Sequence, residues 1–258
     1  MLPCGAVLKN RIAKAAMTEG LADGTNRANE RFTTLYSRWG EGGAALLITG
    51  NVLIDRWHLE RGGNLAIDGE QGNEALAALA DMASAAKAHG AHIWMQLNHA
   101  GRQTQKMINP RPNAPSDVGL KMGNGRFGTP TPLSAEQIET IIAGFAHAAK
   151  TAEQCGFDGV QVHAAHGYLM SQFLSPLSNS RTDDYGGSIK NRARLLLEVT
   201  RAIVDEIGGG RTGIRLSPVT PANDIVDENP QPLFDYVVRE LGKLGLAYVH
   251  VIEGATGG

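Results

Sequence analysis

Residues 159–198 of the chain read GVQVHAAHGYLMSQFLSPLSNSRTDDYGGSIKNRARLLLE. A short apolar run ends in His163, His166 and Tyr168, which places two imidazoles and a phenol within six residues. A long polar loop containing the turn pair Gly186-Gly187 follows, and then a helical pattern. In parallel α/β proteins, side chains at the carboxyl ends of strands meet ligands. We therefore interpret this stretch as the active-site edge of a barrel strand.

Apolar runs and amphipathic segments alternate along the rest of the chain. Strands are predicted at residues 10–20, 44–50, 92–102, 159–163, 212–218 and 248–254, and helices at residues 27–40, 73–89, 134–152, 188–207 and 231–244. This order predicts a parallel sheet with helices outside it. A closed barrel of this kind has about eight strand–helix units. The expected fold class is therefore α/β, of the (β/α)8 TIM-barrel type, with only about six βα units present. Residues 1–258 are expected to form a single barrel domain that is C-terminally incomplete.

Three segments carry more specific predictions. Residues 10–20 are interpreted as a short buried strand ending at Met17-Thr18. Ser134 and Gln137 have the spacing of a capping box at the start of a helix. Residues 103–133 are rich in Pro, Gly and Asn and show no periodicity, so they are predicted to be a long loop, which in a compact domain is usually functional or disordered.

The composition narrows the class of protein. The chain has 258 residues, 42% of them hydrophobic, and a formal net charge of −2, which fits one large soluble α/β domain and argues against a nucleic-acid surface. No run of about 18 apolar residues predicts a membrane span, and the first ten residues lack a signal-peptide core. Cys4 and Cys155 are too few for a four-thiolate metal site. Free thiols suit a reducing compartment, so we expect a cytoplasmic protein.

The group of His163, His166 and Tyr168 is the best candidate for chemistry. Two N–H donors directed at one oxygen would polarise a carbonyl, and a nearby phenol could deliver a proton. The group could instead be structural, with hydrogen-bonded histidines and a packed tyrosine. A histidine pair can also bind zinc, but no third ligand is evident beside this pair, and we predict no metal site.

Gln96, Arg215 and Thr18 are weaker candidates. The amide of Gln96, at the end of an apolar strand, could read the edge of a pyrimidine-like ring, or it could belong to a loop-forming polar cluster. Arg215 lies inside the apolar run IRLSP, and burying a guanidinium is costly unless it meets an anion or several acceptors. Its partner could be a ligand or an unidentified carboxylate. Thr18 alone carries little information.

Taken together, four segments resemble the Old Yellow Enzyme family of flavin-dependent oxidoreductases, also called NADH:flavin oxidoreductases. They are NRIAKAAMT (10–18), MQLNHAGR (95–102), the long run at 163–198 and IRLSP (214–218). The resemblance covers essentially the whole chain, and the long run is highly specific.

The resemblance implies a (β/α)8 barrel that holds FMN at its carboxyl end. Thr18 would touch the flavin near C4=O and N5, Gln96 would bind the pyrimidine edge, and Arg215 would lie by N1 and C2=O. The remaining cofactor-binding residues would be Ala16, Met17, Gly50 and His163.

The resemblance also implies the reaction. His163 and His166 would bind the carbonyl oxygen of a small α,β-unsaturated carbonyl substrate, and Tyr168 would protonate its α-carbon. NADH or NADPH would first reduce the flavin in the same pocket, giving ping-pong turnover.

The chain departs from the family pattern at its end. The seventh and eighth strands of the family, whose loops grip the FMN phosphate, are not expected within these residues. Two alternatives therefore stay open. One is an incomplete barrel that binds flavin weakly or needs a partner chain, such as a second copy in a homo-oligomer. The other is a flavin-free barrel lyase or metal-dependent enzyme that uses the histidine pair. No nucleic-acid or membrane partner is expected.

Overall fold

The computed structural model describes residues 1–121, 125–219, 223–225, 227 and 229–253. Its main sheet is entirely parallel. The strands are β1 (Ala13–Lys14), β2 (Leu46–Leu53), β3 (Leu65–Ala66), β4 (His92–Asn98), β7 (Gly159–Ala164), β8 (Thr212–Leu216) and β9 (Tyr248–Val251). They follow the spatial order β1-β2-β4-β7-β8-β9, with β3 paired to β2. Sequential parallel neighbours of this kind form the open wall of a half-barrel, which confirms the predicted fold class.

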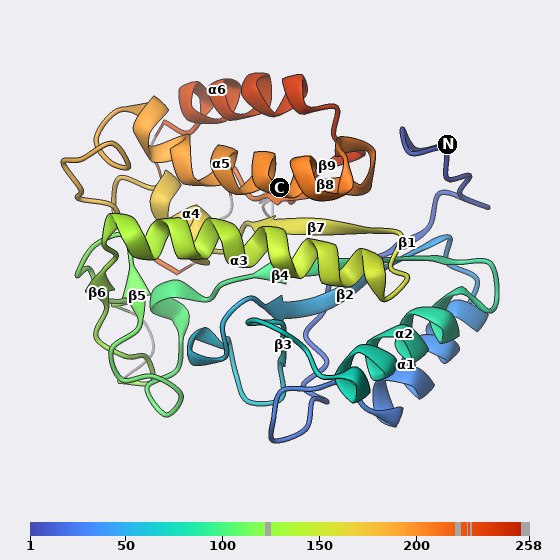
Figure 1. Cartoon of the computed structure of the whole chain (residues 1–258). Helices are drawn as coiled ribbons and strands as arrows, with labels where there is room; N and C mark the ends of the chain where they lie inside the picture. The colour runs from blue at the N-terminus through green and yellow to red at the C-terminus, as the bar shows by residue number, and fades with distance from the viewer. Residues whose placement is uncertain (122–124, 220–222, 226, 228, 254–258) are drawn as a thin grey trace, which may run out of the picture.

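Helices cover the outer face of this wall (Figure 1). They are α1 (Glu30–Glu41), α2 (Asn73–Lys87), α3 (Ala135–Gln154), α4 (Leu169–Leu174), α5 (Ile189–Ile207) and α6 (Gln231–Leu241). All positions of β2 and β7 are buried, as expected for strands covered on both faces. The carboxyl ends of the central strands lie on the same side of the sheet as the short pair β5 (Asn113–Ala114) and β6 (Thr131–Pro132), as Figure 1 shows.

The predicted helices are confirmed, with small differences at their ends. Ser134 caps α3 through the predicted capping box, because its side chain accepts from the Gln137 backbone while the Gln137 side chain accepts from the Ser134 N–H. Such a cap stabilises a helix by about 1 kcal/mol. The helix predicted at residues 231–244 ends at Leu241 and continues as a 3-10 turn over Gly242–Leu244.

The first strand was predicted too long and too buried. Only Ala13 and Lys14 pair with β2, and they are exposed and half-buried, respectively. β1 lies at an edge of the described sheet, where one side of a strand has no neighbour to bury it.

The polar loop predicted after Tyr168 contains the buried helix α4, which was not predicted. The segment 103–133 is not uniform loop either, because it holds β5 and β6. Gly254, the end of the last predicted strand, lies outside the described residues, as does the chain end in the predicted domain 1–258.

One large apolar core joins the helices to the outer face of the sheet, and α3 and α5 contribute Phe145 and Leu196 to it. A smaller cluster, around Trp94 and Ile48, closes the inside of the half-barrel. In the described part of the chain, none of the helices combines the length and apolarity that crossing a lipid bilayer requires.

Candidate active site

The register of the sheet brings the predicted site residues on the strands to two adjacent levels of the half-barrel. Gln96 of β4 is the register partner of Gln161 of β7. One step toward the carboxyl ends, His163 of β7 is the partner of Arg215 of β8, and Arg215 is the partner of His250 of β9. Side chains two residues apart on a strand share a face, so Gln161 and His163 face the same interior.

A chain of amides crosses the interior below this level. The Gln96 Nε2 donates to Asn51 Oδ1 at 2.8 Å, and Gln161 Nε2 donates to Gln96 Oε1 at 2.6 Å. His250 Nδ1 lies 3.3 Å from Gln161 Oε1. These contacts tie β2, β4, β7 and β9 together through buried polar groups, which hold each other in fixed orientations.

Thr18 reaches the same network through a loop residue. Its Oγ1 donates to Glu60 Oε2 at 2.7 Å, and Asn51 Nδ2 donates to the same oxygen at 2.7 Å. The segment carrying Thr18 passes directly over Gly50, where an added Cβ would lie 2.5 Å from the Met17 carbonyl oxygen. Only a glycine permits this approach.

Ala16 and Met17 lie outside this hydrogen-bonded network. Ala16 packs against the small cluster of Trp94 and Ile48 inside the half-barrel. The Met17 side chain is exposed, and only its backbone is tied to the strand level through Gly50.

The imidazole of His163 is buried and has a defined tautomer. The Ala165 backbone N–H donates to His163 Nδ1 at 3.3 Å. Because Nδ1 accepts, the neutral ring carries its hydrogen on Nε2, which makes Nε2 a donor. Burial holds the pKa of His163 well below its usual value, and the neighbouring His166 and Arg215 lower it further.

His166 and Tyr168 are presented by a tight turn after β7. His166 has φ 57° and Gly167 has φ 77°, a left-handed pair that is unfavourable for histidine and easy for glycine. The His166 N–H donates to Ser217 Oγ at 3.0 Å. The rings of His163 and His166 lie 5.3 Å apart, and those of His163 and Tyr168 lie 4.9 Å apart. Both rings therefore lie against His163.

Helix α4 fixes this turn from below. Its Gln172 is buried, and Nε2 donates to the carbonyls of Gly167 at 2.7 Å and Ala100 at 3.2 Å. Its Oε1 accepts from the Arg102 backbone N–H at 3.1 Å. One amide thus joins the turn after β7 to the turn after β4, and Tyr168 is the N-cap residue of α4.

The surroundings shift the pKa values of His166 and Tyr168 so that the histidine is neutral and the phenol is protonated at neutral pH. Burial and the nearby Arg215 lower the pKa of His166 to about 4. Burial raises the pKa of Tyr168 well above its usual value, and the charge of Glu60 raises it further. At neutral pH the imidazoles are uncharged N–H donors, and the phenol keeps its proton.

Two buried groups at this level have no protein partner among the described residues. They are the Arg215 Nε and both polar atoms of the Asn98 amide. Burial lowers the pKa of the Arg215 guanidinium, and no carboxylate of the described chain pairs with it. Orphaned buried polar groups need an explanation, and a bound ligand is one.

Zinc chemistry at the histidine pair finds no support. In the described ranges, the one group with metal-ligand spacing is Asp55, His58 and His99, which includes neither His163 nor His166. Both nitrogens of His58 are already engaged, by Asp55 Oδ2 at 2.6 Å and by the Asn113 N–H at 2.8 Å. His58 and His99 stack at 4.3 Å, so this group is a structural cluster.

Asn51, Glu60 and Gln161 belong to the site but were missed in the sequence. Asn51 and Gln161 are polar residues inside fully buried strands, and this pattern alone could have identified them. Glu60 lies in an irregular loop whose path depends on the whole fold, so no sequence pattern predicts its place.

Residues 5–257 match the model of the NADH:flavin oxidoreductase / NADH oxidase family. The chain belongs to this family. The resemblance to the Old Yellow Enzyme is thereby confirmed.

Two relatives illustrate the similarity. The chain is 39% identical over 256 residues to the NADH-dependent flavin oxidoreductase nadA of Aspergillus parasiticus, covering 91% of this chain and 57% of that protein. It is 42% identical over 179 residues to 12-oxophytodienoate reductase 2 of Arabidopsis thaliana, covering 66% of this chain and 48% of that protein. The chain thus spans about half the length of these two relatives.

Solved structures give the same result. The Old Yellow Enzyme homologue from Zymomonas mobilis superposes with a TM-score of 0.89 at 32% identity, covering 97% of this chain and 71% of that one. Morphinone reductase superposes with a TM-score of 0.87 at 32% identity, covering 97% of this chain and 70% of that one. The half-barrel therefore matches the larger part of the fold of these two proteins.

The residues present fit a flavin ring. A flavin offers acceptors at N1, C2=O and C4=O, and the unpaired Arg215 Nε is a cationic donor at the same level as His163. Thr18 and Gln96 lie in one hydrogen-bonded network with Glu60 and Asn51. The close approach over Gly50 places the backbone of Met17 and Thr18 against β2.

Proposed function

We propose that this chain is the flavin- and substrate-binding part of an FMN-dependent oxidoreductase. Its reaction is the reduction of the activated C=C bond of α,β-unsaturated carbonyl compounds, with NADH or NADPH as reductant and ping-pong turnover. Related proteins carry names of such enzymes, including 12-oxophytodienoate reductase 2, and morphinone reductase has been solved with tetrahydroNAD. The substrate and the choice of nicotinamide are part of the proposal.

In this proposal FMN, when bound, supplies the hydride chemistry, and the protein supplies orientation and electrostatics. Thr18, Gln96 and Arg215 hold the ring, with Ala16, Met17, Gly50 and His163 lining it. Arg215 provides a positive charge for the pyrimidine side, where negative charge collects on reduction.

His163 and His166 bind the carbonyl oxygen of the substrate. His163 contributes an Nε2–H, because its Nδ1 accepts the Ala165 N–H. A carbonyl that accepts two N–H bonds becomes a better electrophile at its β-carbon. Neutral imidazoles suit this role, because each still has one N–H to donate to the carbonyl oxygen and carries no positive charge that would favour an anionic ligand instead.

Tyr168 delivers a proton to the α-carbon of the substrate. The phenol keeps its proton in the resting protein, because burial and the Glu60 charge raise its pKa. Proton transfer becomes favourable only when negative charge develops on the substrate, which matches the general-acid role.

The single observation that carries the proposal is the unpaired, buried Arg215 Nε next to the His163–His166–Tyr168 group. A structural arginine would meet a carboxylate or several acceptors at this place, and the Arg215 Nε meets neither among the described residues.

The experiment is a test of the two half-reactions. The protein is loaded with FMN and mixed without oxygen with NADH or NADPH, and then with cyclohexenone. We expect the flavin absorbance to bleach in the first step and to return in the second. FMN-loaded protein that neither nicotinamide bleaches would contradict the proposal, and failure to bind FMN would favour an incomplete barrel that needs a partner.

A cytoplasmic location is part of the same proposal. Both cysteines, Cys4 and Cys155, are free. Free thiols persist in a reducing compartment.

A further inference from the structure

The carboxylate of Glu19 joins the segment that precedes it to strand β2 and helix α1. Its Oε1 accepts from the Gly50 backbone N–H at 2.8 Å and from the hydroxyl of Tyr36. Tyr36 is buried, and burial and the Glu19 charge raise its pKa well above the usual value, so the phenol keeps the hydrogen that it donates. One carboxylate oxygen is therefore bonded to a strand and to a helix at the same time.

The Gly50 N–H is available to Glu19 because Gly50 lies in a β-bulge. The register between β2 and β4 shifts between Ile48 and Asn51, so that two residues of β2 lie opposite one residue of β4. A bulge of this kind leaves backbone groups out of the ladder of hydrogen bonds between strands. Glu19 supplies the partner that the Gly50 N–H would otherwise lack.

The bulge also sets the position of Gln96. The hydroxyl of Thr49, the other bulged residue, accepts the Gln96 backbone N–H at 2.9 Å and donates to the Gly50 carbonyl at 2.8 Å. Directly after the bulge, Asn51 and Gln96 lie opposite each other, and their side-chain amides are bonded at 2.8 Å. A slip of β2 by one residue would turn Asn51 to the other face of the sheet.

Lys14 makes a second side-chain bond to β2. Backbone pairing between β1 and β2 ends at Lys14 and Leu47. The Lys14 Nζ donates to the Ile48 carbonyl at 2.7 Å and lies 4.1 Å from the centre of the Trp39 ring, a cation–π contact. Burial lowers the pKa of Lys14 to about 8, although the Glu19 charge opposes this shift, so the ammonium is mostly charged at neutral pH. Lys14 thus bonds to β2 directly before the bulge.

Residues 16–18 cross β2 between these two side chains. A Cβ added to Gly50 would lie 2.5 Å from the Met17 carbonyl oxygen and 2.7 Å from the Thr18 Cα. Among the described residues, no backbone hydrogen bond joins residues 16–19 to β2. The close approach is therefore held by the side chains of Lys14 and Glu19, one on each side of the crossing.

We propose that Glu19, supported by Lys14, is a positioning residue of the flavin site, which clamps residues 16–18 onto the bulge of β2 and thereby fixes Thr18 and Gln96 relative to each other. The inference rests on the proposed function, because that function assigns Thr18 and Gln96 to the flavin. Glu19 acts through the backbone of Gly50, so its effect on the flavin is indirect.

The first test compares Glu19→Leu with Glu19→Gln, and the dissociation constant of oxidised FMN is measured by fluorescence titration. The amide oxygen of the glutamine variant still accepts from Gly50 and Tyr36, so its affinity should stay within about threefold of wild type. The leucine variant loses both bonds, and its affinity should fall at least about tenfold. Equal affinity of folded Glu19→Leu and wild type would overturn the inference.

Phe32→Leu separates positioning from a loss of stability. Phe32 is buried in the core one helical turn before Tyr36, so the change lowers the free energy of unfolding without removing a bond of Glu19. FMN affinity should stay at the wild-type value. A loss equal to that of Glu19→Leu would mean that Glu19 acts through stability alone and would overturn the inference. Glu41→Leu, at the exposed end of α1, is the charge control and should bind FMN as wild type does.

Tyr36→Phe is the second variant should Glu19→Leu not fold. It keeps the ring and removes the hydroxyl that holds Glu19 to α1. We expect FMN affinity to fall about threefold and the visible circular dichroism of the bound flavin to change, because this signal reports the surroundings of the ring. A wild-type affinity together with a wild-type spectrum would overturn the inference.

The failure of this inference is distinct from the failure of the proposed function. Wild-type protein that does not bind FMN would contradict the proposed function. Wild-type protein that binds FMN, with unchanged binding in folded Glu19→Leu, would overturn the clamp alone.

Discussion

The two histidines of the site are ordinary in type but unusual in surroundings. His163 is enclosed, with Nδ1 bound to a backbone N–H, and His166 adopts a left-handed conformation beside Arg215. Both surroundings favour the neutral ring. The residue types at the strand ends could be predicted from sequence, but the tautomer and the neutral state follow from contacts that only the folded chain makes.

The lowered pKa of His166 predicts that the stability of the folded protein depends on pH. The pKa of His166 is about 4 in the folded protein, below its ordinary value of 6.5, so the unfolded chain binds more protons between these values. The free energy of unfolding should therefore fall as the pH decreases through this window. Urea unfolding of wild type and His166→Asn at about pH 7 and about pH 5 measures this effect. The variant should lose less stability than wild type, and an equal loss would show that His166 is not responsible.

Tyr168→Phe separates the two half-reactions. The change removes the proton donor but keeps the ring, so reduction of the enone should slow by about a hundredfold or more. Reduction of the flavin by nicotinamide should stay close to wild type. Stopped-flow absorbance measures each half-reaction, and an equal loss in both would argue against the proton-donor role.

Among the elements, α4 is the helix that the sequence pattern did not predict. The βα alternation predicted the main strands and helices, because long periodic segments carry strong patterns. α4 has six residues and no exposed face, so no amphipathic pattern marks it. β1 was overestimated because an apolar run does not reveal that a strand lies at an edge.

Gln172→Leu tests how strongly α4 holds the site. The buried amide binds the backbone at Ala100, Arg102 and Gly167, and removing it leaves those groups without partners. We expect the free energy of unfolding to fall by about 2–4 kcal/mol. Gln154→Leu, at an exposed position of α3, is the matched control and should change stability little. Equal stability of the two variants in urea would contradict this role.

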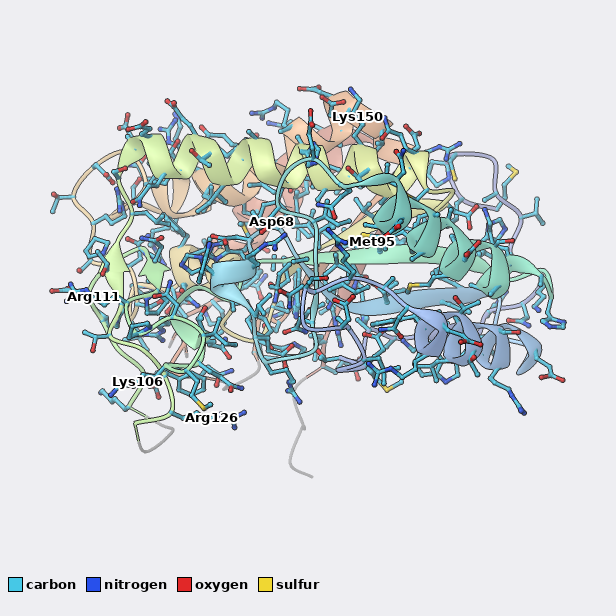
Figure 2. All side chains as sticks on the ribbon, turned by 60° about the horizontal axis from the view of Figure 1, so that its bottom comes forward. Asp68, Met95, Lys106, Arg111, Arg126 and Lys150 are labelled. Carbon is cyan, nitrogen blue, oxygen red and sulfur yellow. The ribbon has the colours of Figure 1, made fainter. Side chains whose placement is uncertain are left out.

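At the scale of the molecule, the described sheet has two unpaired edges, β1 and β9. Apolar side chains are exposed on the last strand, with Val249 at 40% and Val251 at 52%. In Figure 2, Lys106, Arg111 and Arg126 point outward from the loop segment around β5 and β6. This loop surface is therefore basic, whereas the exposed side chains Val249 and Val251 make β9 apolar.

Unpaired apolar edges promote association. We expect the chain to self-associate, and Val251→Lys should reduce the association. Val238→Lys is the control, because Val238 is 46% exposed but lies on α6. Sedimentation velocity at several concentrations measures the effect. Identical behaviour of the two variants would show that β9 is not the contact.

The arginine in β8 tests the central claim most directly, because that claim places a flavin ring against Arg215. FMN affinity is compared among wild type, Arg215→Leu and Arg211→Leu, where Arg211 is exposed just before the same strand. We predict that Arg215→Leu weakens FMN binding at least about tenfold and that Arg211→Leu does not. Equal FMN affinity in all three folded proteins would contradict the claim.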